Sequence, residues 1–406
     1  MYKAVFKSKI KLCTGCMACV DSCAHGALKS FVADDGHIYP SFDSNKCIDC
    51  GLCDKVCPIA SLIVPEDKES YPVGAWSKDD KVRSNSASGG VFATLAYSFL
   101  KEGGYVAGAV MDGVLVKHIV TNEADMVLKM QGSKYQQGDA SGVYKAVKKL
   151  LNKGHKVLFC GSPCQTAALY RYVNGNRYEG RLVIVDFICG GFPSILPLRA
   201  FMDNCGFNVK RIVSFRDKDN GWKSKGYTYN LKVEDDAGVV HSMGYENIVT
   251  KAFVSHLLCR NSCRDCQFTS INRVSDLTIG DFWGCGYWPE EESKGISVAV
   301  IHNKAIESVL AQAGLMTNPV TWKDFLPSNP RMVYGQFTEL AKSPVARHPS
   351  FFFRLFPYKV LCSLFNVSGY ISLFSRAHNF YMKKSYMKHQ ENKDRCIADS
   401  LKEIDS

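Results

Sequence analysis

The sequence contains no uninterrupted apolar stretch long enough to cross a bilayer, and its start, Met1-Tyr2-Lys3, opens no apolar signal segment. It also contains no low-complexity tract. With 46% apolar and 22% charged residues, the composition of this 406-residue chain fits neither a disordered nor a membrane-spanning protein. We therefore expect a cytoplasmic protein with two or three globular domains.

Acidic residues are absent from one long segment, between Lys342 and Glu391, where basic residues alternate with phenylalanines. Pro357 is a good first helical residue, and the apolar residues after it lie on one side of a predicted helix. These residues are Val360, Leu361, Leu364 and Phe365. The favoured interpretation is a basic-backed helix packed on the main body. The alternative is an interfacial helix that contacts anionic lipid or a membrane-associated partner.

Cysteine, in contrast, is abundant, with 18 in the chain. The N-terminal part contains two matching runs, Cys13-x2-Cys16-x2-Cys19-x3-Cys23 and Cys47-x2-Cys50-x2-Cys53-x3-Cys57-Pro58. Three thiolates so closely spaced can wrap around one corner of a 4Fe-4S cubane. In two-cluster ferredoxins the fourth ligand comes from the other run. The spacing therefore predicts two cubane clusters.

Each predicted cluster takes three ligands from one run and one from the other. The first cluster is assigned to Cys13, Cys16, Cys19 and Cys57, and the second to Cys47, Cys50, Cys53 and Cys23. Because the runs interlock, neither half should fold alone. From about Lys9 to Ile63 the chain resembles bacterial two-cluster ferredoxins, except that Ala24-His25-Gly26 follows Cys23 where the family usually has proline. Disulfides and structural zinc are the alternatives, but disulfides suit short secreted chains, and zinc sites use paired Cys-x2-Cys knuckles.

Bound clusters change the meaning of the net charge. The formal charge is +11 with every cysteine counted as neutral. Each oxidised cubane with its four thiolates carries about −2, so two or three clusters bring the protein to roughly +5 to +7. We therefore expect no nucleic-acid partner, and no fold signature for one is present.

Beyond the ferredoxin-like head, the proline-bounded segment Pro65–Pro72 predicts a domain boundary. Strand-like and helix-like runs then alternate, which favours an α/β body with a mixed sheet. The predicted strands are Val73–Trp76, Tyr105–Val110, Val114–Val120, Lys156–Phe159, Leu182–Ile188, Tyr227–Val233, Val239–Met243, Asp276–Ile279 and Ser297–Ile301. The predicted helices are Val91–Leu100, Val143–Leu151, one that starts near Pro163, and Glu246–Leu258.

A second set of cysteines follows predicted strands or begins predicted helices: Cys164, Cys189, Cys263 and Cys266. Loops at strand ends are where an α/β sheet assembles its ligands, so four such thiolates could hold a third cubane. Cys160 and Cys259 remain open as alternates. The competing interpretation is that these cysteines are small buried hydrophobes, which we expect for Cys205, Cys285, Cys362 and Cys396.

The loop Ser84–Gly90 precedes the apolar helix predicted from Val91. Serine side chains can cap free N–H groups at a helix start, and glycines let a phosphate approach the backbone there. An ordinary capped loop would look the same. The segment Gln131–Tyr135 supplies a cation and an aromatic ring that could join such a site.

Six short motifs of the body occur in a recognisable order: Ser86–Phe92, Gly132–Tyr135, Gly161–Gln165, Asp186–Cys189, Cys263-x2-Cys266 and Asp276–Gly284. Together they resemble the family of coenzyme F420 hydrogenase/dehydrogenase beta subunits, from about Trp76 to Ala299. That family binds FAD beside a 4Fe-4S cluster. The resemblance implies flavin contacts at Ser86, Ser88, Gly89, Gly90 and Lys134, a pocket shaped by Asp281 and Trp283, and inner cluster ligands at Cys164, Cys189, Cys263 and Cys266.

Two positions depart from the family pattern. Gly190 stands where a histidine is common after the cysteine, and Gly138 where a serine often closes the Gly-Ser-Lys-Tyr motif. Both departures affect the expected acceptor pocket, so the resemblance does not identify the acceptor. No catalytic residue is identified either.

The sequence therefore predicts an α+β protein in four parts. Residues 1–66 form a two-cluster ferredoxin domain, 73–155 and 156–335 the two parts of a flavin-binding body, and 336–406 a basic aromatic helical tail. The predicted function is that of an iron–sulfur flavoprotein oxidoreductase. It would pass electrons between a redox partner protein or ferredoxin, its clusters, FAD and a small organic acceptor, F420-like or other. The alternative is a non-catalytic electron-transfer component of a larger reductase.

Overall fold

The computed structural model describes residues 10–60, 63, 69–219, 221–222, 229–335, 342–365 and 373–405, without the side chains of 10, 373–375 and 405. The first half of the predicted linker Pro65–Pro72 lies outside these residues. So do Tyr227 and Thr228 of one predicted strand and part of the predicted tail.

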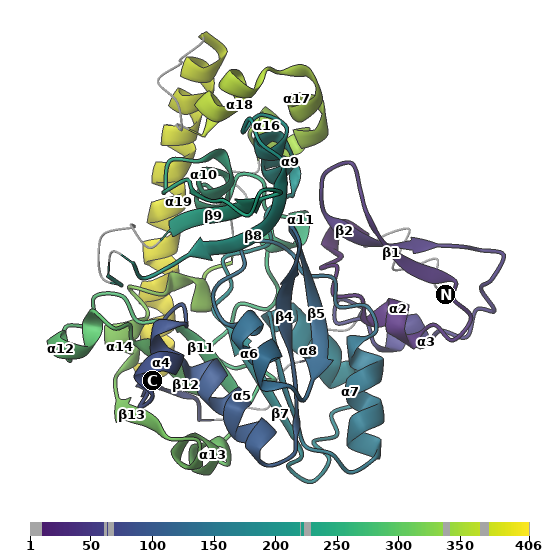
Figure 1. Ribbon diagram of the computed structural model, residues 1–406, viewed down its shortest axis with the longest axis vertical. Helices are drawn as coiled ribbons and strands as arrows, with labels where there is room; N and C mark the ends of the chain where they lie inside the picture. Colours follow the sequence, from purple (N-terminus) through teal and green to yellow (C-terminus); the bar gives the residue numbers. More distant parts are fainter. Residues whose placement is uncertain are drawn as a thin grey trace.

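A mixed sheet organises the body (Figure 1). Among the described residues it has eight strands in the order β13-β3-β12-β11-β7-β6-β4-β5. The central strands are parallel: β4 (Tyr105–Asp112), β6 (Val157–Gly161), β7 (Leu182–Phe187) and β11 (Leu277–Asp281). Antiparallel strands flank them: β5 (Leu115–Thr121) on one side, and β12 (Ser297–Ile301), β3 (Tyr71–Ser77) and β13 (Leu315–Pro319) on the other. The predicted mixed sheet and α+β class are confirmed.

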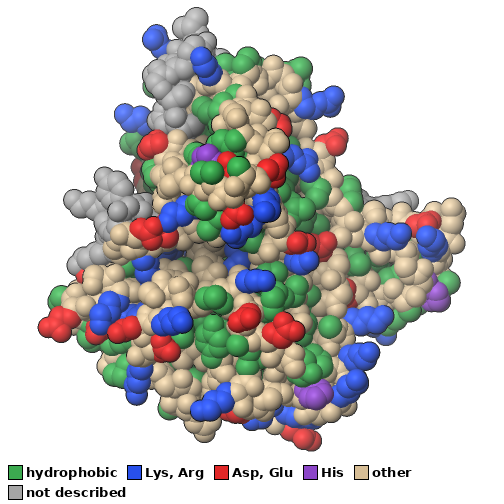
Figure 2. All heavy atoms as spheres, in the orientation of Figure 1, with side chains coloured by type: hydrophobic (Ala, Val, Ile, Leu, Met, Phe, Trp, Pro, Cys, Tyr) green, Lys and Arg blue, Asp and Glu red, His purple; other side chains and the backbone are tan. Residues whose placement is uncertain are grey.

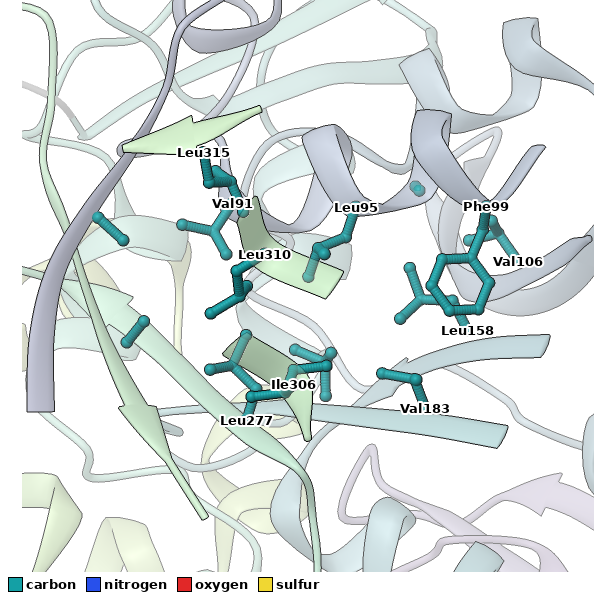
Figure 3. Close-up of a cluster of buried hydrophobic side chains, with 14 of the residues drawn as sticks. Val91, Leu95, Phe99, Val106, Leu158, Val183, Leu277, Ile306, Leu310 and Leu315 are labelled. Carbon is teal, nitrogen blue, oxygen red and sulfur yellow. The ribbon is translucent and has the colours of Figure 1, made fainter. Parts of the chain in front are cut away.

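The central strands are apolar on both faces because helices cover both. Leu158 of β6 packs with Leu95 and Phe99 of helix α5 (Val91–Lys101) in the cluster that Figure 3 shows. Its neighbour Phe159 packs instead with residues of α7 (Val143–Asn152) and α8 (Pro163–Tyr172). Successive side chains of a strand point to opposite faces, so the sheet is the middle layer of three.

A second, smaller sheet continues the chain after β7. Its strands are β8 (Val209–Arg216), β9 (Tyr229–Asp235) and β10 (Val240–Ser242), all antiparallel, as the sequence predicts for the last two. Helices α9 (Leu196–Met202) and α10 (Ile248–Val254) pack against it. Helix α10 is shorter than the predicted Glu246–Leu258. It starts where the Asn247 side chain accepts from Thr250 N, and the chain turns at His256, whose φ is 54°.

The remaining elements of the body are short. They are α4 (Asp80–Ser84), α6 (Ala124–Met130), α11 (Asn261–Arg264), α12 (Pro289–Glu292), α13 (Ile306–Gln312), α14 (Trp322–Phe325) and η2 (Pro330–Met332).

The N-terminal head shows the duplication that its cysteines predict. It contains η1 (Ile10–Leu12), α2 (Ala18–Ser22), the antiparallel hairpin β1 (Leu28–Val32) and β2 (Ile38–Phe42), and α3 (Leu52–Lys55). The residue before the second cysteine of each run has a left-handed φ, 66° at Gly15 and 58° at Asp49. Its N–H donates to the first cysteine of the run, at 3.4 Å in both loops. The two loops therefore share one local geometry.

The C-terminal part forms helices α16 (Pro344–Arg347), α17 (Pro349–Leu355), α18 (Tyr358–Leu364) and α19 (Leu373–Asp405). Leu361, Leu364 and Phe365 are buried in the cluster that also contains Ile212 and Leu231 of the small sheet. The apolar side of α18 therefore faces the body, in agreement with the favoured interpretation of this segment.

Helix α19 runs back along the body (Figure 1), and Ile397 packs near Phe282 and Phe325. Among the described helices, none combines the length and the apolar character that a membrane span requires. Figure 2 shows that Lys and Arg side chains are interspersed with Asp and Glu on the face in view.

The packing of α18 can be tested with one buried and one exposed leucine. Leu361 is 2% exposed and Leu355 is 64% exposed. Leu361→Ala should lower the free energy of unfolding by about 2–5 kcal/mol because it leaves a cavity between α18 and the body. Leu355→Ala should change it by less than about 0.5 kcal/mol. Anaerobic urea denaturation followed by circular dichroism measures both, and equal effects would contradict the packed arrangement.

Candidate redox site

The structure brings the first predicted ligand set together at the base of the head. The pKa of Cys16 is raised to about 12, chiefly by burial and also by the nearby Cys57 and Cys13 thiols. Burial also raises the pKa of Cys19, again with Cys16, Cys13 and Cys57 adding to the shift. Buried thiols packed this closely need a cationic centre to be held as thiolates.

The second predicted set surrounds a small cavity at the far end of the head. Cys23, Cys47, Cys50 and Cys53 all line this cavity, which has a volume of about 30 Å³. Cys50 is exposed, and Ile48 and Leu52 beside it are partly open to solvent. This set is therefore the one near the protein surface.

The third set lines another cavity of about 30 Å³ inside the body. Cys164 comes from the start of α8, Cys189 follows β7, and Cys263 and Cys266 lie in and just after α11. Cys160 and Cys259 do not line this cavity. Cys160 lies on a larger cavity described below.

Hydrogen bonds to the sulfurs indicate that these sites suit iron–sulfur clusters. Gly191 N donates to Cys189 Sγ and Phe192 N to Cys263 Sγ, each at 3.4 Å, as Gly15 N and Asp49 N do in the head. Such N–H groups stabilise thiolates and tune cluster potentials. Among the described residues, no group of three or more His, Cys, Asp or Glu side chains could hold a single metal ion. A cubane is compatible with that finding, because its four ligands bind four different irons.

The first and third sets are neighbours across the contact between head and body. The pKa of Cys164 is raised by burial and then by other thiols, Cys16 of the head among them. Thr14 lines the inner cavity, and Ser262 Oγ donates to Cys13 O at 3.1 Å. The order of the sets from the surface inward is therefore the Cys47 set, the Cys13 set and the Cys164 set.

Buried side chains of the body hold the first cysteine loop. Gln137 Nε2 donates to Thr14 O at 3.0 Å and to Gly15 O at 3.2 Å, and Tyr144 Oη donates to Cys16 O at 2.7 Å. A Cβ on Gly15 would collide with Gln137 and would lie 2.6 Å from Ile38 O and 2.9 Å from Arg260 Nη1. Only glycine allows this close approach.

A cavity of about 480 Å³ opens beside the inner set, at the carboxyl ends of β6, β7 and β11. Cys189 and Arg331 line both this cavity and the inner cysteine cavity, so the two adjoin. Of the residues predicted to contact flavin, five line the large cavity: Ser86, Ser88, Gly90, Lys134 and Asp281.

Gly89 is not among the lining residues. Its N–H donates to Ser297 Oγ at 3.0 Å, and a Cβ there would collide with Ala75 O and lie 2.8 Å from Ser297 N. This glycine therefore allows the loop before α5 to pack closely on β3 and β12. The flavin contact predicted at Gly89 rests on the family resemblance, and a Ser-Gly-Gly loop has the same composition in both roles.

Lys134 and Asp281 have protein partners. The Lys134 ammonium donates to three carbonyls at the end of α6, those of Met130, Gln131 and Gly132, at 2.9–3.2 Å, and burial lowers its pKa to about 8. Asp281 accepts from Arg216 Nη1 at 2.6 Å. Lys134 thus braces the loop at the cavity wall, and Asp281 holds a buried arginine there.

Three cavity residues that the sequence analysis did not single out have buried polar atoms without a hydrogen-bond partner among the described residues. The atoms are Gln165 Nε2, His118 Nδ1, and Nε and Nη2 of Arg216. Burial lowers the pKa of His118 to about 4, so its imidazole is neutral at pH 7. Buried polar groups are normally paired, so these atoms indicate a polar ligand in the cavity. Gln165 adjoins a predicted ligand cysteine, but no sequence signal marks His118 or Arg216.

An aromatic wall closes the cavity near Arg216. The guanidinium lies over the Trp283 ring at 4.8 Å, and Trp283 stacks on Trp222 with 4.3 Å between ring centroids. Tyr135 stacks on Phe253 at 4.0 Å. Flat rings and unpaired donors together suit a large planar ligand with polar edges.

The head, the cysteine sets and the mixed sheet define an iron–sulfur protein with an N-terminal dicluster domain. Residues 12–61 match the family model described as 4Fe-4S dicluster domain. Residues 154–318 match the family model for the C terminus of the beta subunits of coenzyme F420 hydrogenase/dehydrogenase. These matches confirm both resemblances noted in the sequence.

One relative agrees with these matches. An F(420)H(2) dehydrogenase subunit from Methanosarcina mazei is 23% identical over 292 residues, which cover 68% of this chain and 77% of the relative. Among solved structures, a chain from a xenon-derivatised F420-reducing [NiFe] hydrogenase complex of Methanosarcina barkeri is 18% identical, with a TM-score of 0.45. That match covers 69% of this chain and 96% of the other.

The close contact at Gly15 predicts an asymmetry between the duplicated loops. Gly15→Ala should lower the free energy of unfolding by about 1–3 kcal/mol because the added methyl group is forced against the body. Asp49→Ala, at the matching position of the exposed loop, should cost less than about 1 kcal/mol, because that position already holds a side chain at positive φ. Anaerobic thermal denaturation of the reconstituted variants provides the comparison. A larger loss of stability for Asp49→Ala than for Gly15→Ala would contradict the close contact between the Gly15 loop and the body.

Proposed function

We propose that this chain is an iron–sulfur flavoprotein oxidoreductase, in which three 4Fe-4S clusters connect the protein surface to FAD in the 480 Å³ cavity. The observation that carries the proposal is the shared wall between the inner cysteine cavity and the large cavity, formed by Cys189, Gly191, Phe192 and Arg331. A cluster and a flavin placed on either side of that wall would be close enough to exchange electrons. The flavin would supply the exchange between single electrons from the clusters and a hydride from an organic partner.

The cavity residues have separate roles in this proposal. Gln165 is oriented by its capping box, in which Oε1 accepts from Ser162 N at 3.0 Å, so its amide N–H groups remain available to an acceptor on the ligand. Arg216 supplies a positive charge held by Asp281. The neutral His118 can donate or accept a hydrogen bond without adding charge. The aromatic wall excludes water from the reacting edge.

The Cys47 set is the proposed entry or exit point for electrons, since its cavity is lined by exposed residues of the head tip. A ferredoxin or another redox protein would bind there. The name of the M. mazei relative makes F420 the first acceptor to test. The departures at Gly138 and Gly190, both of which line the large cavity, leave other organic acceptors open.

A second candidate is a non-catalytic electron-transfer component of a larger reductase, because the M. mazei relative is itself named as one subunit of a dehydrogenase. The two functions differ in what the isolated chain can do. An oxidoreductase, reduced anaerobically, would reoxidise its flavin with F420 or another small acceptor by itself. An electron-transfer component would need its partner for that step.

The cysteine sets predict the iron content. The wild-type chain, purified anaerobically, should contain about twelve irons, and Cys263→Ala/Cys266→Ala should contain about eight, because it lacks two ligands of one cubane. Cys160→Ala/Cys259→Ala is the matched control and should retain about twelve. Colorimetric iron and sulfide assays give the counts. A value near eight for the wild type would remove the inner cluster from the proposal.

Gly190 allows a test of the flavin position. A Cβ there would meet only ordinary contacts, 3.4 Å from Phe253 and 3.7 Å from His256. Gly190→Ala should therefore retain bound FAD, whereas Gly190→Trp fills the cavity and should lower FAD occupancy at least tenfold with no loss of iron. Flavin fluorescence after denaturation measures the occupancy. Full occupancy in Gly190→Trp would place the flavin elsewhere.

A further inference from the structure

Arg260 is a buried cation at the contact between head and body. It directly precedes α11, which carries the inner ligand Cys263, and its side chain is 0% exposed. Nε donates to Cys13 O at 2.6 Å, and Nη1 donates to Ile38 O at 2.8 Å. The guanidinium thus crosses from the inner cysteine set to the first cysteine loop of the head.

No carboxylate among the described residues forms an ion pair with Arg260. Its other contacts are neutral: Nη1 donates to Gln137 Oε1 at 2.9 Å, and the guanidinium lies over the Tyr39 ring at 4.0 Å. Nη2 is buried and has no hydrogen-bond partner in the described part of the chain. A buried, unpaired cation is strongly unfavourable, so an anionic group is expected nearby.

The thiolate clusters are the anions that this position offers. The Cys13 backbone contacts Arg260 directly through its carbonyl, and on the other side Cys263 N donates to Arg260 O at 2.9 Å. An oxidised cubane with four thiolates carries about −2, and reduction adds one more negative charge. A fixed cation in a low-dielectric site stabilises the reduced form more than the oxidised form.

We propose that Arg260 is a positioning residue that raises the reduction potential of the cluster held by Cys13, Cys16, Cys19 and Cys57 above that of the cluster held by the Cys47 set. The inference rests on the cluster assignment in the proposed function. The step concerned is a single-electron transfer: the Cys47-set cluster is oxidised, the Cys13-set cluster is reduced, and no bond or proton changes. Arg260 would therefore favour electron transfer from the exposed tip of the head to the Cys13-set cluster.

A variant of the neighbouring Gln137 can distinguish this electrostatic role of Arg260 from a merely structural one. Gln137 also joins head to body through Thr14 O and Gly15 O, but it is neutral. A variant without its amide loosens the same contact and keeps the charge of Arg260. If loosening alone moved cluster potentials, the Gln137 and Arg260 variants would behave alike.

The test is an EPR-monitored redox titration of the reconstituted full chain, with iron content measured first. Signals are assigned with Cys50→Ser, which alters only the Cys47-set cluster. Arg260→Gln should lower the midpoint potential of the Cys13-set cluster relative to that of the Cys47-set cluster by about 59 mV. For a one-electron couple this is about a tenfold fall in the equilibrium ratio of reduced Cys13-set to reduced Cys47-set cluster. Arg260→Lys should restore most of the ratio, and Gln137→Met should leave it unchanged.

The result that overturns the inference is an unchanged ratio in a fully loaded Arg260→Gln protein, or an equal shift in Gln137→Met. If Arg260→Gln does not retain its iron, the test is pulsed EPR of the reduced wild type labelled with 15N-arginine. A coupling between an arginine 15N nucleus and the Cys13-set cluster is expected. The absence of this coupling overturns the proposal. A wild-type chain without two EPR-active head clusters would instead overturn the cluster assignment itself.

Discussion

The contact between head and body depends on backbone carbonyls of the first cysteine loop that accept hydrogen bonds from buried side chains of the body. Arg260, Gln137 and Tyr144 reach the loop from three separate segments, and Gly15 is the point where no side chain fits between them. This contact places the Cys13 set beside the inner set. Without it, the head would be a ferredoxin-like unit with no defined route into the large sheet.

The large sheet supplies the other half of the arrangement. Its parallel strands β6, β7 and β11 end at one edge, and each end delivers a different group there: Cys160 and Cys164, Cys189, and Asp281. Ligands of an α/β sheet gather at this edge because the strand ends leave loops free to converge. The inner cysteine set and the large cavity are neighbours for this reason.

Much of this arrangement was predictable from local patterns. The strands and helices predicted from Val73 to Ile188 follow the alternation of apolar runs and are present, although the short helices α4 and α6 were not predicted. The duplicated cysteine spacing predicted the ligand sets that the structure gathers. The sequence was least informative where the same residue types suit both ligand binding and packing. The Ser-Gly-Gly loop interpreted as a flavin contact also contains Gly89, which packs on β3 and β12, and the lysine expected at the flavin caps α6 through three carbonyls. The length of α10 was overestimated mainly because the apolar run continues past Val254 to Leu258, whereas the chain turns at His256, whose φ is 54°.

The sequence by itself determined the groups that are close along the chain: the two cysteine runs with their matching loops, the strand order in the chain and the apolar side of α18. Only the tertiary structure decided which distant groups meet. Gln165, His118 and Arg216 become unpaired donors of one cavity, and Arg260 comes to lie between two cysteine sets. Of these four residues, only Gln165 lies in a motif that the sequence marks. The physical reason is that spacing along a loop sets ligand geometry within a few residues, whereas burial and desolvation arise only when separate segments pack together.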